Sequence, residues 1–209
     1  MAYADFSLKV CLRRLLAPVL FARTHYKASL RKVKIEPGVI CADFDRIGAY
    51  SFLGRNVTIG PNLERMGMFC SVGEGCLIGP NIHATDGLTT SVAFVGGIER
   101  KMIKQALNSR PVCMGNDVWV GSHAIIMSGV TVGDGVIIGA GSVLTKDAPP
   151  YSIWVGNPAR LLKYRLSEAT IERIQQLDIF SSPADTLYEW FKRSQGMTIK
   201  DALDRFQSS

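Results

Sequence analysis

A six-residue repeat runs through most of this chain and restricts its fold more than any other feature. From Ile35 the sequence divides into hexads such as IGAYSF and LGRNVT, with a one-residue step at Arg65 and a pause from Ala84 to Cys113. In the fourteen hexads the first residue is aliphatic, methionine or, once, cysteine, and the second is glycine in ten. A period of six is incompatible with the 3.6-residue period of an α-helix.

The side-chain pattern within the hexad predicts a stacked coil. Position one is apolar, and position five is small or β-branched apart from Asp45 and Leu63. A short extended segment would turn both positions inward, and glycine at position two permits the bend that follows. Three hexads then close one triangular coil, which buries its apolar edges only against the next coil. The predicted fold class is an all-β solenoid, a parallel β-helix.

The composition is that of a folded protein rather than a disordered one. Of the 209 residues, 47% are hydrophobic and 20% are charged, which suffices for a core. The longest uncharged apolar run, residues 15–22, is far shorter than the ~20 residues of a membrane span. No signal-peptide pattern is visible. The five cysteines are odd in number and form no C-x-x-C motif, which is typical of a reducing compartment. We therefore expect a cytoplasmic protein.

Two segments flank the repeat. Residues 1–34 hold eight of the 24 lysines and arginines, with leucines at helical spacing. This basic segment is either a helical cap over the open first coil, which we prefer, or an interfacial helix on the anionic inner face of a membrane. Residues 166–209 return to a helical pattern, with Ser167 as N-cap, a second helix over 184–193 and a third after Thr198. The expected domains are the cap 1–34, the β-helix 35–165 with an inserted loop 84–113, and the C-terminal helices 166–209.

Three stretches of the sequence resemble a known family. They are FCSVGEGCLIGPNIHATDG, the long run from Gly115 to Lys163, and the acidic-basic helical segment after it. They are similar to the hexapeptide-repeat acetyltransferases, of the xenobiotic and polysaccharide O-acetyltransferase type that is related to the maltose and galactoside acetyltransferases. The resemblance implies a left-handed β-helix, acetyl coenzyme A as co-substrate with no metal, and a homotrimer with sites at the subunit clefts.

The pause in the repeat is the expected catalytic site, because a loop of this length in a compact domain is usually functional. It opens with His83, which we place at the sixth, outward-facing position of its hexad, and Asp86 follows three residues later. In the family a histidine here is the general base. An imidazole with a pKa near ~6.5 can take the proton of an attacking hydroxyl, and Asp86 can orient it. Backbone N–H groups around Gly121 and Ser122 are the candidates for stabilising the oxyanion.

The donor groove is expected beside the late coils. Trp119 ends its hexad, should point outward, and by resemblance lines the acyl channel near the thioester; packing against a neighbouring subunit is the alternative. Small residues let a pantetheine chain lie against the backbone, and basic side chains can pair with phosphates. The remaining coenzyme-binding candidates carried over from the family motifs are Gly121, Ser122, Ala140, Thr145, Lys146, Arg160 and Lys163.

The resulting prediction is an acetyl-coenzyme-A-dependent O-acetyltransferase that acts on a saccharide hydroxyl of surface polysaccharide or lipopolysaccharide. The alternatives are O-acetylation of an antibiotic, N-acetylation of an amino sugar, and a non-catalytic β-helix scaffold. A zinc enzyme of the γ-carbonic anhydrase kind would need three converging histidines, and only His83 and His123 lie near the repeat. The net charge of +6 favours an anionic partner, but no nucleic-acid-binding motif occurs.

Overall fold

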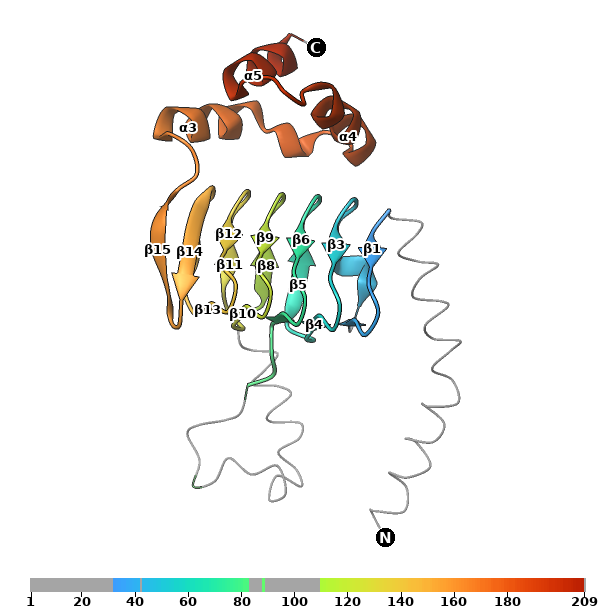
Figure 1. The fold of residues 1–209 in the computed structure, drawn as a ribbon, viewed down its shortest axis with the longest axis vertical. Helices are drawn as coiled ribbons and strands as arrows, with labels where there is room; N and C mark the ends of the chain where they lie inside the picture. Colours follow the sequence, from blue (N-terminus) through green and yellow to red (C-terminus); the bar gives the residue numbers. More distant parts are fainter. Residues whose placement is uncertain (1–31, 42, 83–87, 89–109, 209) are drawn as a thin grey trace.

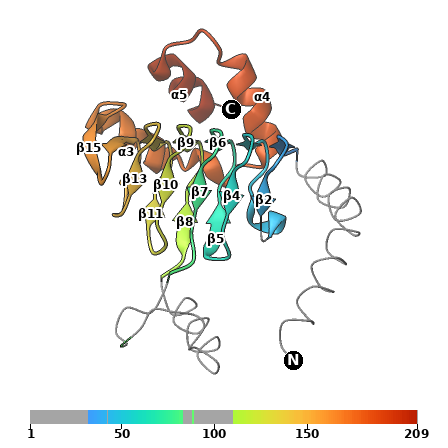
Figure 2. The same cartoon turned by 60° about the horizontal axis from the view of Figure 1, so that its bottom comes forward.

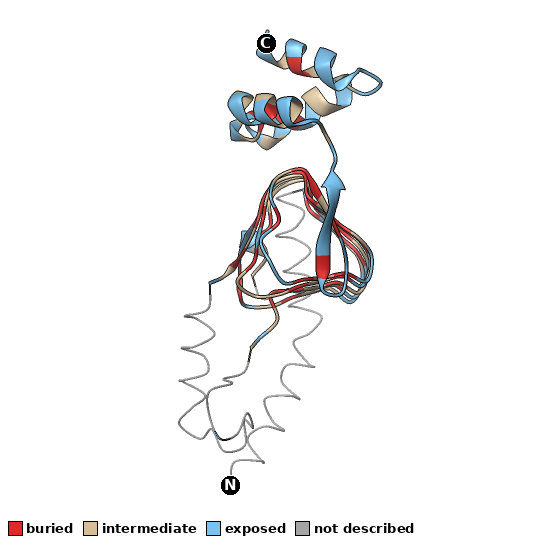
Figure 3. Ribbon diagram, turned by 90° about the vertical axis from the view of Figure 1, so that its left-hand side faces the viewer, coloured by how far each residue is buried: buried red, intermediate tan, exposed pale blue. Residues whose placement is uncertain are grey.

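The chain folds into a triangular solenoid with a layer of helices along one edge. The computed structural model describes residues 32–41, 43–82, 88 and 110–208. Viewed along the solenoid axis, successive coils superpose as a triangle, and buried residues recur along the coils (Figure 3). The fold is the predicted left-handed parallel β-helix with C-terminal α-helices. The predicted N-terminal helical cap lies, except for its last three residues, outside the described part of the chain.

The described strands form three sheets, one on each side of the triangle. The first sheet has the order β1, β3, β6, β9, β12, β14, β15, the second β13, β10, β7, β4, β2, and the third β11, β8, β5 (Figures 1 and 2). The bounds of the first sheet are β1 Lys34–Ile35, β3 Phe52–Leu53, β6 Ser71–Val72, β9 Trp119–Val120, β12 Ile137–Ile138, β14 Ser152–Gly156 and β15 Ala159–Tyr164. Those of the second are β2 Ile40–Cys41, β4 Thr58–Ile59, β7 Leu77–Ile78, β10 Ile125–Ile126 and β13 Val143–Leu144. Those of the third are β5 Leu63–Met66, β8 Val112–Met114 and β11 Thr131–Val132, and the short helix η1 is Phe44–Arg46.

Strand pairing confirms the three-hexad coil. Lys34 pairs in parallel with Phe52, and Trp119 pairs with Ile137, so each coil advances the chain by 18 residues. Each two-residue strand covers position six of one hexad and position one of the next. The one-residue step predicted at Arg65 appears as a β-bulge in β5, where the register shifts between Leu63 and Arg65. A β-bulge absorbs one extra residue without interrupting the stack.

From the third hexad onward, the residues that occupy positions one and five of the coils are buried, as predicted. From Ile47 to Leu144 every position-one residue is at most 2% exposed. Leu63, which departs from the small residues at position five, is also buried at 1% and fills the inside of its corner. The inside of the triangle is therefore a continuous apolar column, and each coil contributes its own section of that column.

Two cysteines at position five serve as small core residues. The Cys70 thiol donates to the Gly115 carbonyl at 3.3 Å and the Cys76 thiol to the Gly121 carbonyl at 3.1 Å. Burial raises the pKa of Cys70 to about 12, so this thiol stays protonated at neutral pH. The four cysteines in the described residues are free.

Three corners join the sides, and we name them by what lies there. The Trp119 corner follows the first sheet and contains Gly121–His123 and Gly139–Gly141. The insertion corner follows the second sheet and contains Gly60–Asn62, Gly79–Asn81, Met127–Gly129 and Thr145–Asp147. The helix corner follows the third sheet and contains Gly48–Tyr50, Gly67–Phe69, Gly115–Asp117 and Gly133–Gly135.

The register moves the inserted segment by two residues from its predicted place. We expected Ile82 and His83 to complete a hexad, with the insertion at 84–113. Instead Val112 pairs with Leu63, and Cys113 pairs with both Arg65 and Thr131, so Val112 and Cys113 fill positions five and six of this coil. Val112 is fully buried, as position five requires. The insertion is therefore 82–111, and the outward position predicted for His83 belongs to Cys113.

The chain leaves the last coil through a hairpin and returns along the helix corner. β14 and β15 pair antiparallel, with Asn157 and Pro158 in the turn between them. The helices are α3 Glu168–Leu177, capped by Ser167 as predicted, η3 Ile179–Ser181, α4 Ala184–Arg193 and α5 Ile199–Gln207. They lie along one edge of the solenoid, from its last coil back to its first (Figure 1). No helix in the described ranges is long and apolar enough to cross a membrane.

Candidate functional site

The structure brings four predicted residues together at the Trp119 corner. Trp119 lies in β9, and Gly121 and Ser122 follow it in the turn. Ala140 occupies the same turn one coil further on, where the Gly141 N–H donates to the Ser122 carbonyl at 2.9 Å. A Cβ on Gly121 would stand 2.5 Å from the Ala140 nitrogen, so only glycine lets the two turns stack this closely.

Trp119 points out of the solenoid, as predicted. Its side chain is 54% exposed, and its strand neighbours on the first sheet are Ser71 on one side and Ile137 on the other. Ser71 and Ile137 are both smaller than tryptophan, which agrees with the exposure of the indole between them. An exposed tryptophan of this kind is available to a ligand or to a second protein chain.

The Gly121 N–H cannot serve the oxyanion role that we expected. It donates to the Ile138 carbonyl at 2.7 Å as part of the ladder between coils. The Ser122 nitrogen lies against the next lower turn, where a Cβ on Gly73 would approach it to 2.6 Å. Coil stacking therefore accounts for the Gly121 N–H, and the oxyanion role stays a prediction for the Ser122 N–H.

The two basic residues of the hairpin lie beyond Ala140 at the end of the solenoid. Arg160 pairs with Val155, and Lys163 pairs with Ile153, in the antiparallel arm β14–β15. The Gly156 N–H donates to the Ser142 hydroxyl at 3.0 Å, which attaches the hairpin to the coil that carries Ala140. Both basic side chains are exposed, so cations lie next to the Trp119 corner, at the end of the groove predicted for the coenzyme.

Thr145 and Lys146 do not join this group. They follow β13 and therefore lie at the insertion corner, one side of the triangle away from Ala140, with exposed side chains. Six residues of extended chain at ~3.3 Å each correspond to roughly 20 Å. On one chain the predicted donor residues thus form two separate groups.

His83 and Asp86, the predicted base and its partner, lie outside the described residues. What the structure shows is how the chain leaves and re-enters the β-helix around them. The Asn62 amide nitrogen donates to the Pro80 carbonyl at 3.2 Å and to the Ser128 hydroxyl at 3.0 Å. The Ser128 hydroxyl donates to the same Pro80 carbonyl at 2.6 Å. On the return, the Val112 N–H donates to the Asn62 backbone carbonyl at 2.8 Å.

Sequence reasoning missed Asn62 and Ser128. The signal was the repeated turn Gly-Pro-Asn at 60–62 and 79–81, which places a side chain with two N–H donors directly under the interrupted turn. Asn62 is 8% exposed, so its amide needs internal partners and has them.

An ion pair holds the returning chain at the same corner. The Arg110 guanidinium lies 2.6 Å from the Asp147 carboxylate, which also accepts the Thr131 N–H at 2.7 Å. The Arg110 hydrogen bond, and then that of Thr131, lowers the pKa of Asp147 below its usual value. Asp147 is therefore ionised throughout the physiological range and keeps Arg110 in place.

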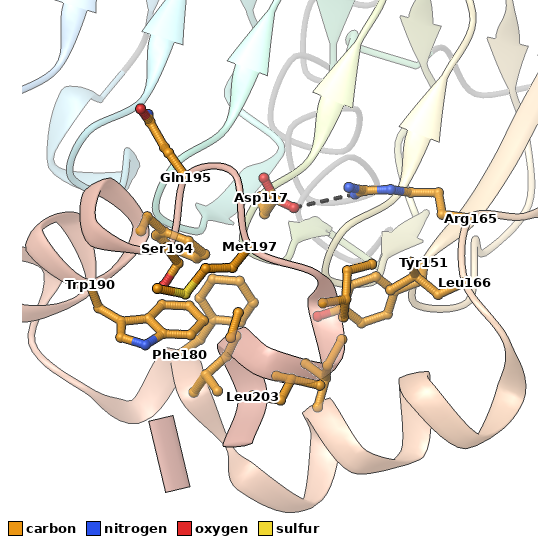
Figure 4. A pocket seen from close by; sticks show the side chains of 15 residues that line it. Asp117, Tyr151, Arg165, Leu166, Phe180, Trp190, Ser194, Gln195, Met197 and Leu203 are labelled. Atoms are coloured by element: carbon orange, nitrogen blue, oxygen red, sulfur yellow. Dashed lines mark hydrogen bonds and ion pairs between the residues drawn. The ribbon is translucent and has the colours of Figure 1, made fainter. Parts of the chain in front are cut away.

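A separate pocket lies between the helix corner and the C-terminal helices (Figure 4). Its volume is about 270 Å³, and its wall is largely apolar, with Phe180, Met197 and Leu203 among the lining residues. Asp117 and Arg165 form an ion pair of 3.2 Å at its rim, where burial raises the pKa of Asp117 although Arg165 opposes the shift. None of the eight described candidate residues lines this pocket, so it is distinct from the predicted site.

Metal ligands do not gather in the described part of the chain. There, no group of three or more histidine, cysteine, aspartate or glutamate side chains could hold a metal ion. His123, the histidine within the described ranges, is exposed in the Trp119 corner with a φ of 59°. Its ring lies over Gly75, where a Cβ would stand 2.4 Å from its Nδ1.

Sequence comparison identifies similar proteins. Residues 114–146 match the family model described as "Bacterial transferase hexapeptide (six repeats)". A probable macrolide acetyltransferase of Lysinibacillus sphaericus is 35% identical over 111 residues, which is 51% of this chain and 62% of that protein. A chloramphenicol acetyltransferase of Agrobacterium fabrum is 46% identical over 74 residues, 35% of each chain. The chain thus spans between 35% and 62% of the length of these curated relatives.

Solved structures with the same fold carry related names. A hexapeptide-repeat-containing acetyltransferase from Vibrio cholerae superposes with a TM-score of 0.51 and 25% identity, over 65% of this chain and 72% of that one. A second structure of that enzyme, in complex with acetyl coenzyme A, superposes with a TM-score of 0.51 and 22% identity, over 70% and 78% of the two chains. With its hexads, its parallel β-helix and these likenesses, the chain is similar to the hexapeptide-repeat acetyltransferases.

Proposed function

We propose that this protein transfers the acetyl group of acetyl coenzyme A to a hydroxyl of a saccharide, as in the modification of surface polysaccharide or lipopolysaccharide. The observation that carries the proposal is the Trp119 corner, where an exposed indole, a tight stack of small residues and the nearby basic side chains Arg160 and Lys163 follow one another along the solenoid. Two of the similar proteins are named as acetyltransferases, and the Vibrio cholerae structure holds acetyl coenzyme A.

In the proposed reaction His83 is the general base. Its imidazole removes the proton from the acceptor hydroxyl as the hydroxyl oxygen attacks the thioester carbonyl. The tetrahedral intermediate then collapses, the bond between the carbonyl carbon and sulfur breaks, and the coenzyme thiolate takes the proton. Asp86 orients the imidazole. Trp119 and Ala140 border the pantetheine chain, and Arg160 and Lys163 pair with the coenzyme phosphates.

A homotrimer would unite the two separate groups of residues. On one chain the insertion corner, from which the His83 segment leaves, and the Trp119 corner are roughly 20 Å apart along one side of the triangle. A second copy could place its insertion corner against the Trp119 corner of the first. Exposed apolar residues of the first sheet favour such a contact. Trp119 is 54% exposed and Leu162 is 60% exposed.

An antibiotic hydroxyl is the second candidate acceptor. It is favoured by the printed names of the macrolide and chloramphenicol acetyltransferases.

The decisive experiment follows thiol release from acetyl coenzyme A with a panel of sugars, oligosaccharides, amino sugars and antibiotics. His83→Ala should lower kcat by about 10² to 10⁴ while coenzyme binding, measured by calorimetry, is retained. The rate of the unaltered protein should rise with pH through about 6.5, as an imidazole base loses its proton.

The matched control is His123→Asn, because asparagine accepts the positive φ of that turn. We expect it to leave turnover within about twofold. A loss of turnover in His123→Asn with none in His83→Ala would assign the role of general base to His123.

Coenzyme binding without thiol release in the presence of any acceptor would exclude the tested substrate classes. Sedimentation as a single chain would contradict the homotrimer.

A further inference from the structure

The insertion corner contains a closed hydrogen-bond network at the place where the solenoid is interrupted. The chain leaves the coil after the turn Gly79–Asn81 and returns at Val112, so the backbone between the coil of Asn62 and the coil of Ser128 is interrupted directly after this turn. Side chains from the coil below and the coil above meet across this gap, with 3.0 Å between the Asn62 amide nitrogen and the Ser128 hydroxyl. These two residues are 66 positions apart in the sequence.

Each hydrogen-bond donor of this network has a partner. Asn62 has two N–H donors, and it uses one on the Pro80 carbonyl and one on the Ser128 oxygen. The Ser128 hydroxyl donates to the Pro80 carbonyl, which therefore accepts two hydrogen bonds. The backbone carbonyl of Asn62 accepts the Val112 N–H. Asn62 thus contacts both ends of the inserted segment, the outgoing end through its side chain and the returning end through its backbone.

We propose that Asn62 is a positioning residue for catalysis, which fixes the outgoing end of the segment that carries His83. This inference rests on the proposed function, because His83 follows Pro80 by only three residues. A rigid attachment at Pro80 limits the directions in which the following residues can leave the coil. A misplacement of about 1 Å of a catalytic group can cost a rate factor of about 10².

The test compares Asn62→Asp and Asn62→Ala with the unaltered protein. Aspartate keeps the size of the side chain but replaces the donor with a carboxylate that faces the Pro80 carbonyl, whereas alanine only removes the donor. We expect both to lower kcat for thiol release by about tenfold or more, with the KM for acetyl coenzyme A within about twofold. Ser128→Ala should have a smaller effect, because Asn62 still holds Pro80.

The matched control is Asn116→Ala. Asn116 is also a corner asparagine, and it accepts the Met68 N–H at 3.0 Å and donates to Asp134 at 3.0 Å, but at the helix corner. It should lower the melting temperature about as much as Asn62→Ala and leave kcat unchanged. An equal loss of kcat in Asn116→Ala would assign the effect to general destabilisation and overturn the proposal.

A second measurement does not depend on activity. The inserted segment contains the sequence sites Arg100, Lys101 and Lys104 for trypsin. We expect initial cleavage there to be several-fold faster in Asn62→Asp and Asn62→Ala than in the unaltered protein or in Asn116→Ala. Unaltered cleavage and unaltered kcat in both Asn62 variants would refute the positioning role. If the unaltered protein releases no thiol, the proposed function fails, while the cleavage rates still report whether Asn62 holds the segment.

Discussion

Single residues in the corners decide whether coils can stack. Gly48 shows this most directly, because a Cβ there would stand 2.3 Å from the Gly67 carbonyl carbon and 2.6 Å from the Met68 nitrogen. These are backbone atoms of the neighbouring coil and cannot rotate away. Gly141 is the contrasting case: its φ is +67°, but a Cβ would meet nothing within 4 Å. The glycines of the hexad therefore serve two physical needs, close approach and a left-handed turn.

Substitution of these two glycines should distinguish the requirement for close approach from the requirement for a left-handed turn. Gly48→Ala forces two coils apart and should cost about 3 kcal/mol of unfolding free energy, near the upper end for overpacking. Gly141→Ala adds only the left-handed backbone and should cost about 1 kcal/mol. Urea denaturation followed by circular dichroism measures both. A larger cost for Gly141→Ala would show that turn conformation, not coil spacing, limits stability.

At the scale of the element, α4 is attached to the solenoid by one mixed polar and aromatic contact. Asp185 accepts hydrogen bonds from Lys32 and from the Tyr50 hydroxyl, each at 2.8 Å. One turn further on, the Tyr188 ring stacks on the Tyr50 ring with 4.5 Å between centroids. Phe191 meets Phe69 edge-on at 5.3 Å. The α4 face thus follows consecutive corner residues of the first coils.

The charged part of this contact predicts a pH dependence. Lys32, then Tyr50, lowers the pKa of Asp185 below its usual value. A lowered carboxyl pKa contributes stability above the ordinary value of 3.8, and that contribution is lost as the pH falls through the folded-state pKa. Asp185→Asn should therefore be less stable than the unaltered protein at pH 7, and the difference should shrink towards pH 3.

Thermal unfolding of both proteins across that pH range measures the difference. Glu189→Gln, an exposed carboxylate on the same helix, is the control and should show a smaller gap at pH 7. A gap for Asp185→Asn that is constant with pH would mean that the carboxylate charge does not hold α4. The effect will be modest, because exposed ion pairs contribute little.

At the scale of the whole molecule, the C-terminal helices connect the two ends of a solenoid. A stack of coils is held together by contacts between neighbours only, so its end coils are free to fray. Here the chain leaves the last coil at β15 and α4 reaches back to Lys32 and Tyr50 beside the first coils, a sequence separation of 153 residues for the Lys32 contact. This return path joins the first coil to the last.

Removing the aromatic contacts should free the first coils selectively. In a Tyr188→Ala, Phe191→Ala double variant we expect faster amide hydrogen exchange in β1 and β3, with little change in β9 to β13. Ile199→Ala on α5, whose side chain is 47% exposed, is the control in the same helical layer. Equal acceleration along the whole solenoid would indicate that the coils unfold as one unit without help from the helices.

The sequence predicted those parts of the site that follow from local order. Trp119, Gly121 and Ser122 are nearly consecutive, and Ala140 lies one coil above them, so their grouping follows from the period alone. The separation of Thr145 and Lys146 from that group follows from the same period. The sequence prediction nevertheless assigned these two residues and the Trp119 group to one coenzyme groove. The Gly121 N–H was wrongly expected to be free, because the hexad pattern does not show which carbonyl of the next coil it meets.

By itself the sequence determined the coil: its period, its inward positions, its glycine corners and the three C-terminal helices. Each depends on spacing within a few residues, which the chain order records directly. Tertiary structure decided the rest. Ile82-His83 and Val112-Cys113 both suit positions five and six, and only pairing with Leu63 and Thr131 selects the second pair. Asn62, Ser128 and Pro80 meet across an interrupted coil, and Asp185 meets Lys32 across the length of the solenoid. Such contacts depend on which distant segments become neighbours, and no local pattern in the chain encodes that.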